Sequence, residues 1–422
     1  MDVESVLEEI KLPDIYYFPE KNWYFWQNGD RWQQSTAADT LLRIKNIRYC
    51  GVIQKGESIN QAQRILLRLQ EEKALRKVIS VGWEEPEVKI INGERTLVMD
   101  GCKLLEPKKG NWDTIRTFTN NLQGEQIDYY KSWQCVAEKG LSGLEKRRPG
   151  QALILTGPSG IGKSLLQNRI ITPLLGGKYA KPFGWLIGET DFNSELFEAC
   201  HMLVEDEFHL ADIKSRTVFG AALKKLTANQ EQRVHRKGFP AYSINTYWRT
   251  TISLNDEPHH IAVLPELDPS LEDKLMILQC ETHPLPLPSG TPIESAFERE
   301  LPAFLYHLLY EYEIPPALRD ERFGVKAFVH PNVKADLDDI DAKQTVAEVL
   351  DTLYGGKGPQ EKRITEILVD ISTYNFPHQL VKQLYSLHSM KSSLRKLSRD
   401  PEYCDKVQYH RSAKRRWWTL NF

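Results

Sequence analysis

Eight consecutive residues near the middle of the chain have the types and spacing of a phosphate-binding loop. They fit the pattern G-x-x-x-x-G-K-[ST] at every fixed position, and they are Gly157, Pro158, Ser159, Gly160, Ile161, Gly162, Lys163 and Ser164. Glycines let such a loop curl until its backbone N–H groups point inward at phosphate oxygens. Lys163 would contact the β- and γ-phosphates, and Ser164 would ligate Mg²⁺. The pattern predicts a nucleotide site with a bound Mg²⁺ ion.

The sequence on both sides of the loop predicts the elements that position it. Residues 152–155 are a short apolar run, as expected of a buried strand, and residues 165–171 have a helical pattern. A strand, a glycine-rich loop and a helix in this order place a helix N-terminus, with its partial positive charge, next to the bound phosphates.

Acidic residues follow the next apolar segment. Residues 201–204 are predicted to form a strand that ends in Glu205, Asp206 and Glu207. Carboxylates at the carboxyl end of a neighbouring strand can hold magnesium and polarise the attacking water. We assign Asp206 to the magnesium shell and Glu207 to activation of water, and Glu205 could take either part. The alternative is a solvated strand end, which the phosphate-binding loop upstream makes less favourable.

A basic hairpin and a second polar strand end come next. Residues 232–244 are predicted to form the hairpin, whose side chains would contact the backbone and bases of single-stranded DNA. These candidates are Arg233, His235, Arg236, Lys237 and Phe239. The simpler interpretation is a solvated hairpin. The strand predicted at 249–254 ends at Asn255, which would orient water and sense the γ-phosphate.

Bulk composition is that of an ordinary globular protein. The chain has 422 residues, 41% hydrophobic and 27% charged, which predicts two to three domains. No apolar run has the length of a membrane span, and the N-terminal residues resemble no export signal. The scattered cysteines predict reduced thiols in the cytoplasm. Because the net charge is -2, any nucleic-acid site must come from local basic patches.

The pattern of predicted elements divides the chain into an N-terminal α+β domain (1–125), an α/β ATPase domain with a helical collar (126–344) and a C-terminal domain (345–422). Aromatic strands around an Asn28-Gly29 turn predict a hairpin in the first, followed by a helix over 59–78. Alternating strands and helices predict a parallel sheet in the second. Residues 331–343 are acidic, and we interpret them as a connector.

The last domain is predicted to be a winged helix. Three helices, at 364–371, 380–387 and 392–399, precede two strands at 407–410 and 416–420. Basic side chains on the third helix and the wing would neutralise phosphates of duplex DNA. They include Arg395, Lys396, Arg399, Lys414, Arg415 and Arg416. The alternative is a winged helix that contacts protein.

The order of these features resembles that of the superfamily 3 helicases of viruses, phages and plasmids, which are AAA+ ATPases. The resemblance is strongest to the helicase half of phage and poxvirus-type primase-helicases, over most of residues 15–335. It implies a homo-hexameric ring that hydrolyses ATP with Mg²⁺ at subunit interfaces. The hairpin would line the pore and pull one DNA strand with 3′→5′ polarity. The chain has no primase motif, so a separate primase is a possible partner.

One departure from the family concerns the residue that acts on the neighbouring subunit. The family places an arginine finger after the asparagine strand, where this chain has Lys274. A lysine cannot make the planar bidentate contact of an arginine, and Arg249 is the other candidate.

The leading hypothesis is an ATP-dependent hexameric DNA helicase of a phage, plasmid or other mobile element. Two other classes stay open. One is an AAA+ switch or remodeller, for example in anti-phage defence, in which ATP drives ring assembly. The other is an origin-binding protein whose ATPase gates loading without unwinding.

Overall fold

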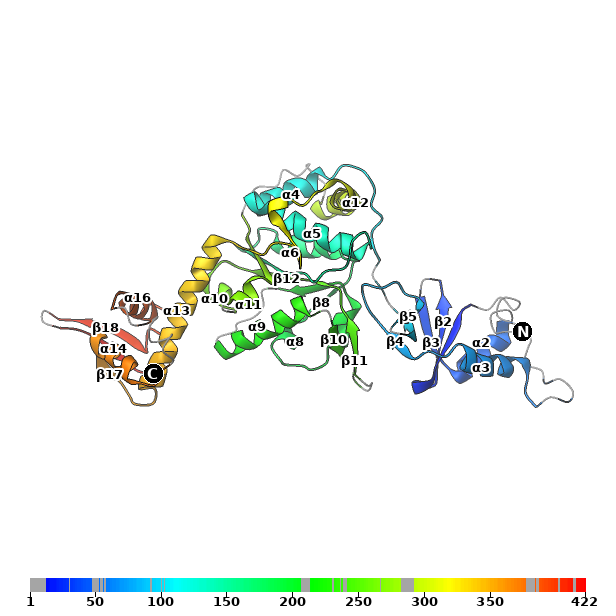
Figure 1. The fold of residues 1–422 in the computed structure, drawn as a ribbon, viewed down its shortest axis with the longest axis horizontal. Coiled ribbons are helices and arrows are strands. Elements are labelled where there is room, and N and C mark those ends of the chain that lie inside the picture. The colour runs from blue at the N-terminus through cyan, green and yellow to red at the C-terminus, as the bar shows by residue number, and fades with distance from the viewer. Residues whose placement is uncertain are drawn as a thin grey trace.

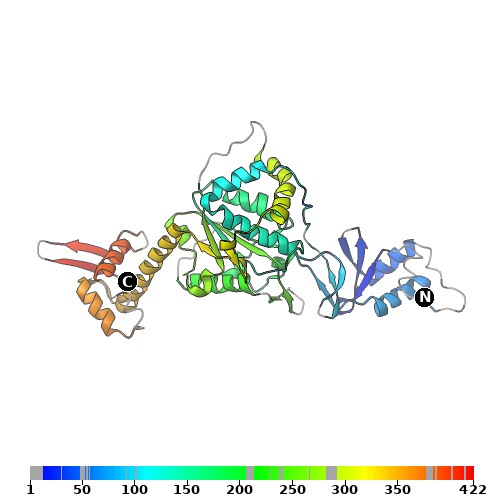
Figure 2. The same cartoon turned by 45° about the horizontal axis from the view of Figure 1, so that its top comes forward.

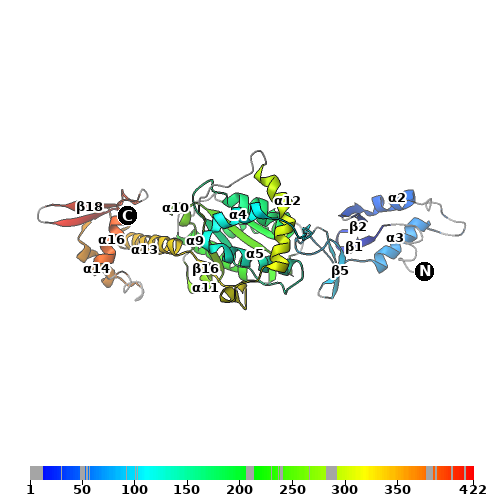
Figure 3. The same ribbon diagram turned by 90° about the horizontal axis from the view of Figure 1, so that it is seen from above.

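The structure is a computed structural model. It describes residues 13–29, 31–47, 53, 56, 58–91, 93–99, 101, 103–205, 213–229, 231–235, 237, 241–265, 267–281, 292–376, 384, 387–400, 403–412 and 415–422. The described chain forms a central α/β body with a smaller part on either side, one N-terminal and one C-terminal (Figures 1, 2 and 3). Within this part of the chain, no helix is both long and apolar enough to cross a lipid bilayer.

A six-stranded parallel sheet is the centre of the molecule. Its strand order is β16-β13-β7-β12-β9-β8, and each described pairing within it is parallel. The strands are β7 (Ala152–Thr156), β8 (Tyr179–Ala180), β9 (His201–Val204), β12 (Arg249–Leu254), β13 (Leu275–Gln279) and β16 (Phe328–Val329). Every residue of β7, β9 and β12 is buried, as expected of strands covered on both faces. The predicted α/β core with a parallel sheet is confirmed.

Helices cover both faces of this sheet (Figure 1). One face carries α4 (Asp113–Gln123), α5 (Ile127–Leu141), α6 (Lys163–Leu166) and α12 (Ile293–Tyr306). The other carries α8 (Phe183–Leu186), α9 (Ile213–Ala228), α10 (Pro258–Ile261) and α11 (Pro269–Glu272). Helix α6 continues through the π-helical turn η3 (Gln167–Ile171) into α7 (Thr172–Leu174), and α12 continues into the π-helical turn η5 (His307–Glu311). Short pairs β10 (Glu231–Val234) with β11 (Tyr242–Asn245), and β14 (Arg319–Asp320) with β15 (Gly324–Val325), complete the body.

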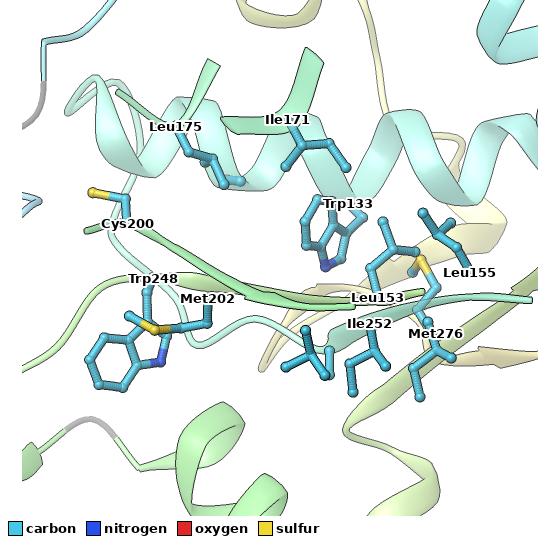
Figure 4. Packing of buried hydrophobic residues seen from close by; sticks show 14 of the residues in the cluster. Trp133, Leu153, Leu155, Ile171, Leu175, Cys200, Met202, Trp248, Ile252 and Met276 are labelled. Atoms are coloured by element: carbon cyan, nitrogen blue, oxygen red, sulfur yellow. The ribbon is translucent and has the colours of Figure 1, made fainter. Parts of the chain in front are cut away.

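Two tryptophans lie on opposite faces of the sheet and fill its core (Figure 4). Trp133 of α5 packs above the strands near Ile171, and its indole N–H donates to the carbonyl of Gln151 at 2.9 Å. Trp248 packs below, and its indole N–H donates to the carbonyl of Leu226 at 2.8 Å. Both large rings are therefore buried without leaving a polar atom unpaired.

Helix α4 belongs to this central core although it precedes residue 126. Its apolar residues Ile115, Phe118 and Leu122 are buried in the same cluster as β7. The change in sequence pattern that predicts a domain limit at 125 does not show which core a helix joins.

The N-terminal part contains two three-stranded sheets. The first has the order β1-β2-β3 and includes the predicted aromatic hairpin, and the second has the order β4-β6-β5. The elements are β1 (Ile15–Phe18), η1 (Pro19–Lys21), β2 (Trp23–Asn28), β3 (Arg31–Thr36), α2 (Ala37–Ile47), α3 (Gln61–Glu72), β4 (Lys77–Ile79), β5 (Val88–Ile91) and β6 (Glu94–Val98).

The helix predicted over 59–78 is shorter than expected. Asn60 and Gln63 form a capping box at its start, but the helix ends at Glu72. The carbonyl of Lys73 accepts from the N–H of Tyr17, and the N–H of Leu75 donates to the carbonyl of Tyr17. Pairing with β1 therefore pulls the chain out of the helix, a tertiary effect that periodicity does not reveal.

The C-terminal part has its own core around Leu350, Ile371, Leu394 and Trp418. Its elements are α13 (Pro331–Tyr354), β17 (Gln360–Lys362), α14 (Ile364–Thr373), α16 (Leu387–Leu397), β18 (Val407–Arg411) and β19 (Arg416–Leu420). The antiparallel sheet has the order β17-β19-β18. The connector predicted at 331–343 is instead the first half of α13, which crosses the limit at 344. The helix predicted at 380–387 lies largely outside the described residues.

Candidate phosphate site

The loop between β7 and α6 requires glycine at its first and last glycine positions. Gly157, Gly160 and Gly162 have φ values of 145°, 78° and 110°. A Cβ on Gly157 would lie 2.6 Å from the carbonyl oxygen of Cys280, and a Cβ on Gly162 would lie 2.9 Å from the ring of Phe118. A Cβ on Gly160 would meet open space. The loop is thus packed against the body at both ends and open at Gly160, where a ligand can approach its backbone.

Lys163 joins the loop to the neighbouring strand. Its side chain is buried, and its ammonium donates to the carbonyls of Gly157 and Pro158, the latter at 2.8 Å. It also donates to Oδ1 of Asn255 at 3.1 Å. Asn255 directly follows β12, which pairs with β7 in the sheet. The structure therefore brings together two residues predicted from separate motifs, and phosphate oxygens would compete with these acceptors for the ammonium.

Glu205, at the end of β9, lies beside the first turns after the loop. Its carboxylate accepts from Nζ of Lys181 at 2.9 Å and from Nδ2 of Asn168 at 3.3 Å. The hydrogen bond from Lys181 is the main cause of a lowered pKa of Glu205. Asn168 also donates to the carbonyl of Ser164 at 3.0 Å. Asn168 therefore links Glu205 to Ser164, the residue predicted to ligate Mg²⁺. Asp206 and Glu207 lie outside the described residues.

The described residues around the loop fit Mg²⁺ only as a partner of phosphate. No group of three or more His, Cys, Asp or Glu residues in the described ranges could hold a metal ion by itself. Ser164 offers an exposed hydroxyl next to the loop. Mg²⁺ at nucleotide sites takes one or two protein oxygens and completes its shell with phosphate oxygens and water. The donor set is therefore of the kind that holds Mg²⁺ together with a nucleotide.

A closed ring of buried hydrogen bonds supports the helix that follows the loop. Nε2 of Gln167 donates to Oγ1 of Thr251 at 2.8 Å, and that hydroxyl lies 2.7 Å from Nε2 of His201. Nδ1 of His201 lies 2.7 Å from Oγ1 of Thr172, which donates to the carbonyl of Gln167 at 2.9 Å. Since Thr172 donates, it accepts from Nδ1–H, and His201 is a neutral imidazole. The ring fastens η3 and α7 to β9 and β12.

This network makes stability depend on pH. Burial lowers the pKa of His201 to about 3, whereas an imidazole in the unfolded chain titrates near ~6.5. The unfolded state binds the extra proton, so the contribution of His201 is complete above ~6.5 and is lost as pH falls toward 3.

We expect the free energy of unfolding to fall by up to about 1.4 kcal/mol per pH unit from this residue alone. Thermal unfolding of wild type and His201→Gln from pH 7 to 5 measures it. The variant should be less stable at pH 7 and should show the shallower pH dependence. Equal slopes for the two proteins would contradict the assignment.

The predicted basic hairpin is present as β10 and β11. Arg233, His235 and Lys237 are all exposed. Asn193, for which the sequence pattern gives no signal, anchors the hairpin. Its Oδ1 accepts from the N–H of His235 at 2.7 Å, and its Nδ2 donates to the carbonyl of Arg233 at 2.8 Å. Arg236 and Phe239 lie outside the described residues. The backbone is thus anchored while the described basic side chains stay exposed, and the ring of His235 lies against that of Phe192 with centroids 5.0 Å apart.

Lys274 and Arg249, the two candidates for the residue that acts on the neighbouring subunit, lie apart from the phosphate-binding loop of their own chain. Lys274 donates to the carbonyl of Ser270 and to Oδ1 of Asp273 at 2.6 Å. Arg249 is 1% exposed; it donates to the carbonyls of Arg148 and Trp248 and lies over the ring of Tyr247. It begins β12, whereas Asn255 follows that strand, a separation of about 20 Å. Arg249 therefore supports the opposite edge of the sheet in this structure.

The predicted basic residues of the C-terminal part are all on its surface where they are described. Lys396 pairs with Asp339 at 2.7 Å, and Arg415 lies 3.7 Å from Glu361. Arg395, Lys396 and Arg399 line a shallow cavity of 310 Å³ on α16 and the turn after it. Arg416 is exposed at the start of β19, and Lys414 lies outside the described residues.

Comparisons with known proteins agree with this architecture. A protein family of unknown function, DUF5906, matches residues 155–268, which include the loop, β9, the hairpin and Asn255. No curated protein sequence matches the chain.

Solved structures give a likeness over the whole chain. Apo structures of the NrS-1 C-terminal region superimpose with TM-scores of 0.58 and 0.56 at 13% and 12% identity. They cover 99% and 100% of this chain and 98% and 99% of theirs. A JCV helicase structure reaches a TM-score of 0.28 at 14% identity over 57% of this chain and 64% of its own, which is too low to support an argument. The α/β fold is thus shared with the NrS-1 region.

Proposed function

We propose that the protein is an ATP-dependent DNA helicase or translocase of a phage, plasmid or other mobile element, acting in the cytoplasm of the host cell. The observation that carries the proposal is the bond between Lys163 and Asn255. It joins the phosphate-binding loop after β7 to the polar end of β12, and Glu205 ends the next strand, β9. Carboxyl ends of parallel strands meet at one edge of the sheet, where a nucleotide can contact all of them.

In this proposal the loop backbone binds the phosphates of ATP, and Lys163 moves from the loop carbonyls to the β- and γ-phosphates. Asn255, released from the ammonium, orients the attacking water. Glu207 would accept a proton from that water as its oxygen bonds to the γ-phosphorus and the bond to the departing ADP breaks, and Asp206 and Ser164 would hold Mg²⁺. When bound, Mg²⁺ neutralises charge that develops on the transferred phosphoryl group. Glu205 stays paired with Lys181 and Asn168 and holds the strand end in place.

Six copies are proposed to form a ring with DNA in its pore. The exposed Arg233, His235 and Lys237 of the hairpin would contact one strand and pull it with 3′→5′ polarity. Lys274 would act on the ATP of the neighbouring subunit, because the buried Arg249 already holds its own chain. The C-terminal part combines α14 and α16 with a sheet whose strand β17 precedes these helices and whose strands β18 and β19 follow them. It would act as a winged helix on duplex DNA through Arg395, Arg399 and Arg416.

The rate of ATP hydrolysis and the mass of the assembly together test this proposal. We expect single-stranded DNA to stimulate hydrolysis several-fold and ATP with DNA to convert the protein into a ring of six chains. Hydrolysis that ignores DNA, with ATP still driving assembly, would instead favour an AAA+ switch. Absence of ATP hydrolysis under every condition would overturn the proposal.

A further inference from the structure

A basic groove runs along the edge of the central sheet opposite the phosphate-binding loop. Two adjoining cavities of 330 and 420 Å³ form it, and both are lined by the segment 146–149, which precedes β7. The first also includes Asn229, which precedes β10, and Asn245, the last residue of β11. The groove therefore begins at the root of the basic hairpin. We call it the root groove and define it by Lys146, Arg147, Arg148, Asn229, Asn245 and Thr246.

Positive charge predominates in the root groove although the whole chain is slightly acidic. Lys146, Arg147 and Arg148 line both cavities. The second also has Glu321 and Arg322, and Arg322 pairs with Asp273 at 3.1 Å. The acidic residue in the first cavity, Glu84, is already neutralised, since it pairs with Arg147 at 2.7 Å and with Lys89 at 2.8 Å. Such an excess of cations on a protein of net charge -2 marks a local site for an anion.

Hydrogen bonds to backbone carbonyls hold the arginines of the groove in place. Arg147 donates to the carbonyl of Trp83 at 2.7 Å, and Arg148 donates to the carbonyl of Glu321. The buried Arg249 donates to the backbone carbonyl of Arg148 at 3.2 Å, and a Cβ on Gly150 would lie 2.5 Å from its side chain. Arg249 is thus a positioning residue that fixes the course of segment 146–149. Basic side chains that are already held in place lose less conformational entropy on binding a ligand than mobile ones do.

The exposed side chains of the root groove determine which kind of ligand it can bind. The tryptophans and tyrosine of the groove, Trp83, Trp248 and Tyr247, are 5%, 6% and 4% exposed, so bases cannot stack on them. Cations and side-chain amides are the accessible groups: Lys146, Asn229 and Asn245 are exposed. Lys146 makes no hydrogen bond or ion pair within the described chain, so its ammonium is available. Such groups bind phosphate and sugar without reading sequence.

We propose that the root groove binds the sugar–phosphate backbone of single-stranded DNA and carries the strand between the hairpin and the outer surface of the body. This inference rests on the proposed DNA contact of the hairpin, with which the groove is continuous. It adds contacts that the hairpin motif does not contain, and it predicts a longer DNA footprint than the hairpin alone would give.

The test compares Lys146→Glu with Lys109→Glu, an equal charge change at an exposed lysine on the loop before α4. The probe is fluorescent oligo-dT, and the dissociation constant is measured by anisotropy from 50 to 200 mM salt. We expect about five- to tenfold weaker binding for Lys146→Glu and a salt slope smaller by about 0.7 to 1. Lys109→Glu should bind as wild type does. The assembly mass of each variant is measured in the same buffer.

Each outcome is decisive. Equal affinities and slopes for the two variants would overturn the groove while leaving the hairpin contact intact, provided that wild type binds the oligonucleotide. A changed assembly mass with unchanged DNA affinity would show that the groove receives a second copy of the chain, which also overturns the proposal. Absence of oligonucleotide binding by wild type would overturn the proposed DNA-dependent function, and with it the proposal that the root groove binds DNA.

Discussion

Replacement of Lys163 by alanine is expected to abolish ATP hydrolysis, a fall on the order of a thousandfold in turnover. The side chain is buried and its ammonium lies at the strand ends, and our proposal places it at both terminal phosphates. Its loss removes positive charge where the transition state is most negative. Phosphate release with saturating ATP and Mg²⁺ measures the effect.

A matched control separates chemistry from folding. Lys178→Ala removes an exposed lysine that lies outside the site and should retain wild-type turnover. Thermal unfolding of both variants measures stability separately, because Lys163→Ala leaves the carbonyls of the buried Gly157 and the exposed Pro158 without the ammonium. Turnover by folded Lys163→Ala at more than a tenth of the wild-type rate would sink the assignment of the phosphate site.

The double substitution His235→Ala with Lys237→Ala is expected to eliminate DNA unwinding while leaving basal ATP hydrolysis unchanged. Both side chains are exposed, and Asn193 holds the backbone at His235 rather than its ring. The hairpin should therefore keep its backbone conformation and lose only its side-chain contacts with DNA. Loss of one ammonium and one imidazole per subunit, repeated around a ring, removes contacts on which every translocation step depends.

The control for the hairpin is Lys109→Ala with Lys178→Ala, which removes two exposed lysines outside the hairpin. This variant should unwind a forked duplex at the wild-type rate. Unwinding at the wild-type rate by the hairpin variant would show that these two side chains do not hold the DNA strand during translocation. Simultaneous loss of ATP hydrolysis would show instead that these residues support the nucleotide site.

Local pattern was sufficient to predict the central architecture. The strand at 152–155, the loop after it and the strand before Asn255 are all present, because fully buried parallel strands are short apolar runs that end in functional residues. The hairpin and both C-terminal strands are also where alternation and turn residues predicted them.

Features that depend on tertiary contacts could not be predicted. The end of α3 is set by pairing of residues 73–75 with Tyr17, and α4 joins the central core through Phe118. His201 appeared as one residue of an apolar strand, and only the structure shows its ring of hydrogen bonds with Gln167, Thr172 and Thr251. Likewise, Arg249 was a finger candidate by position, whereas its burial gives it a supporting role in its own chain.

The most direct test of the central claim is displacement of a labelled strand from a forked DNA duplex by the wild-type protein. The account predicts displacement that requires ATP and Mg²⁺, that is lost in Lys163→Ala, and that begins only when the 3′ tail of the fork is present. Protein that hydrolyses ATP and assembles on DNA, yet leaves forks with either tail fully paired, would contradict it.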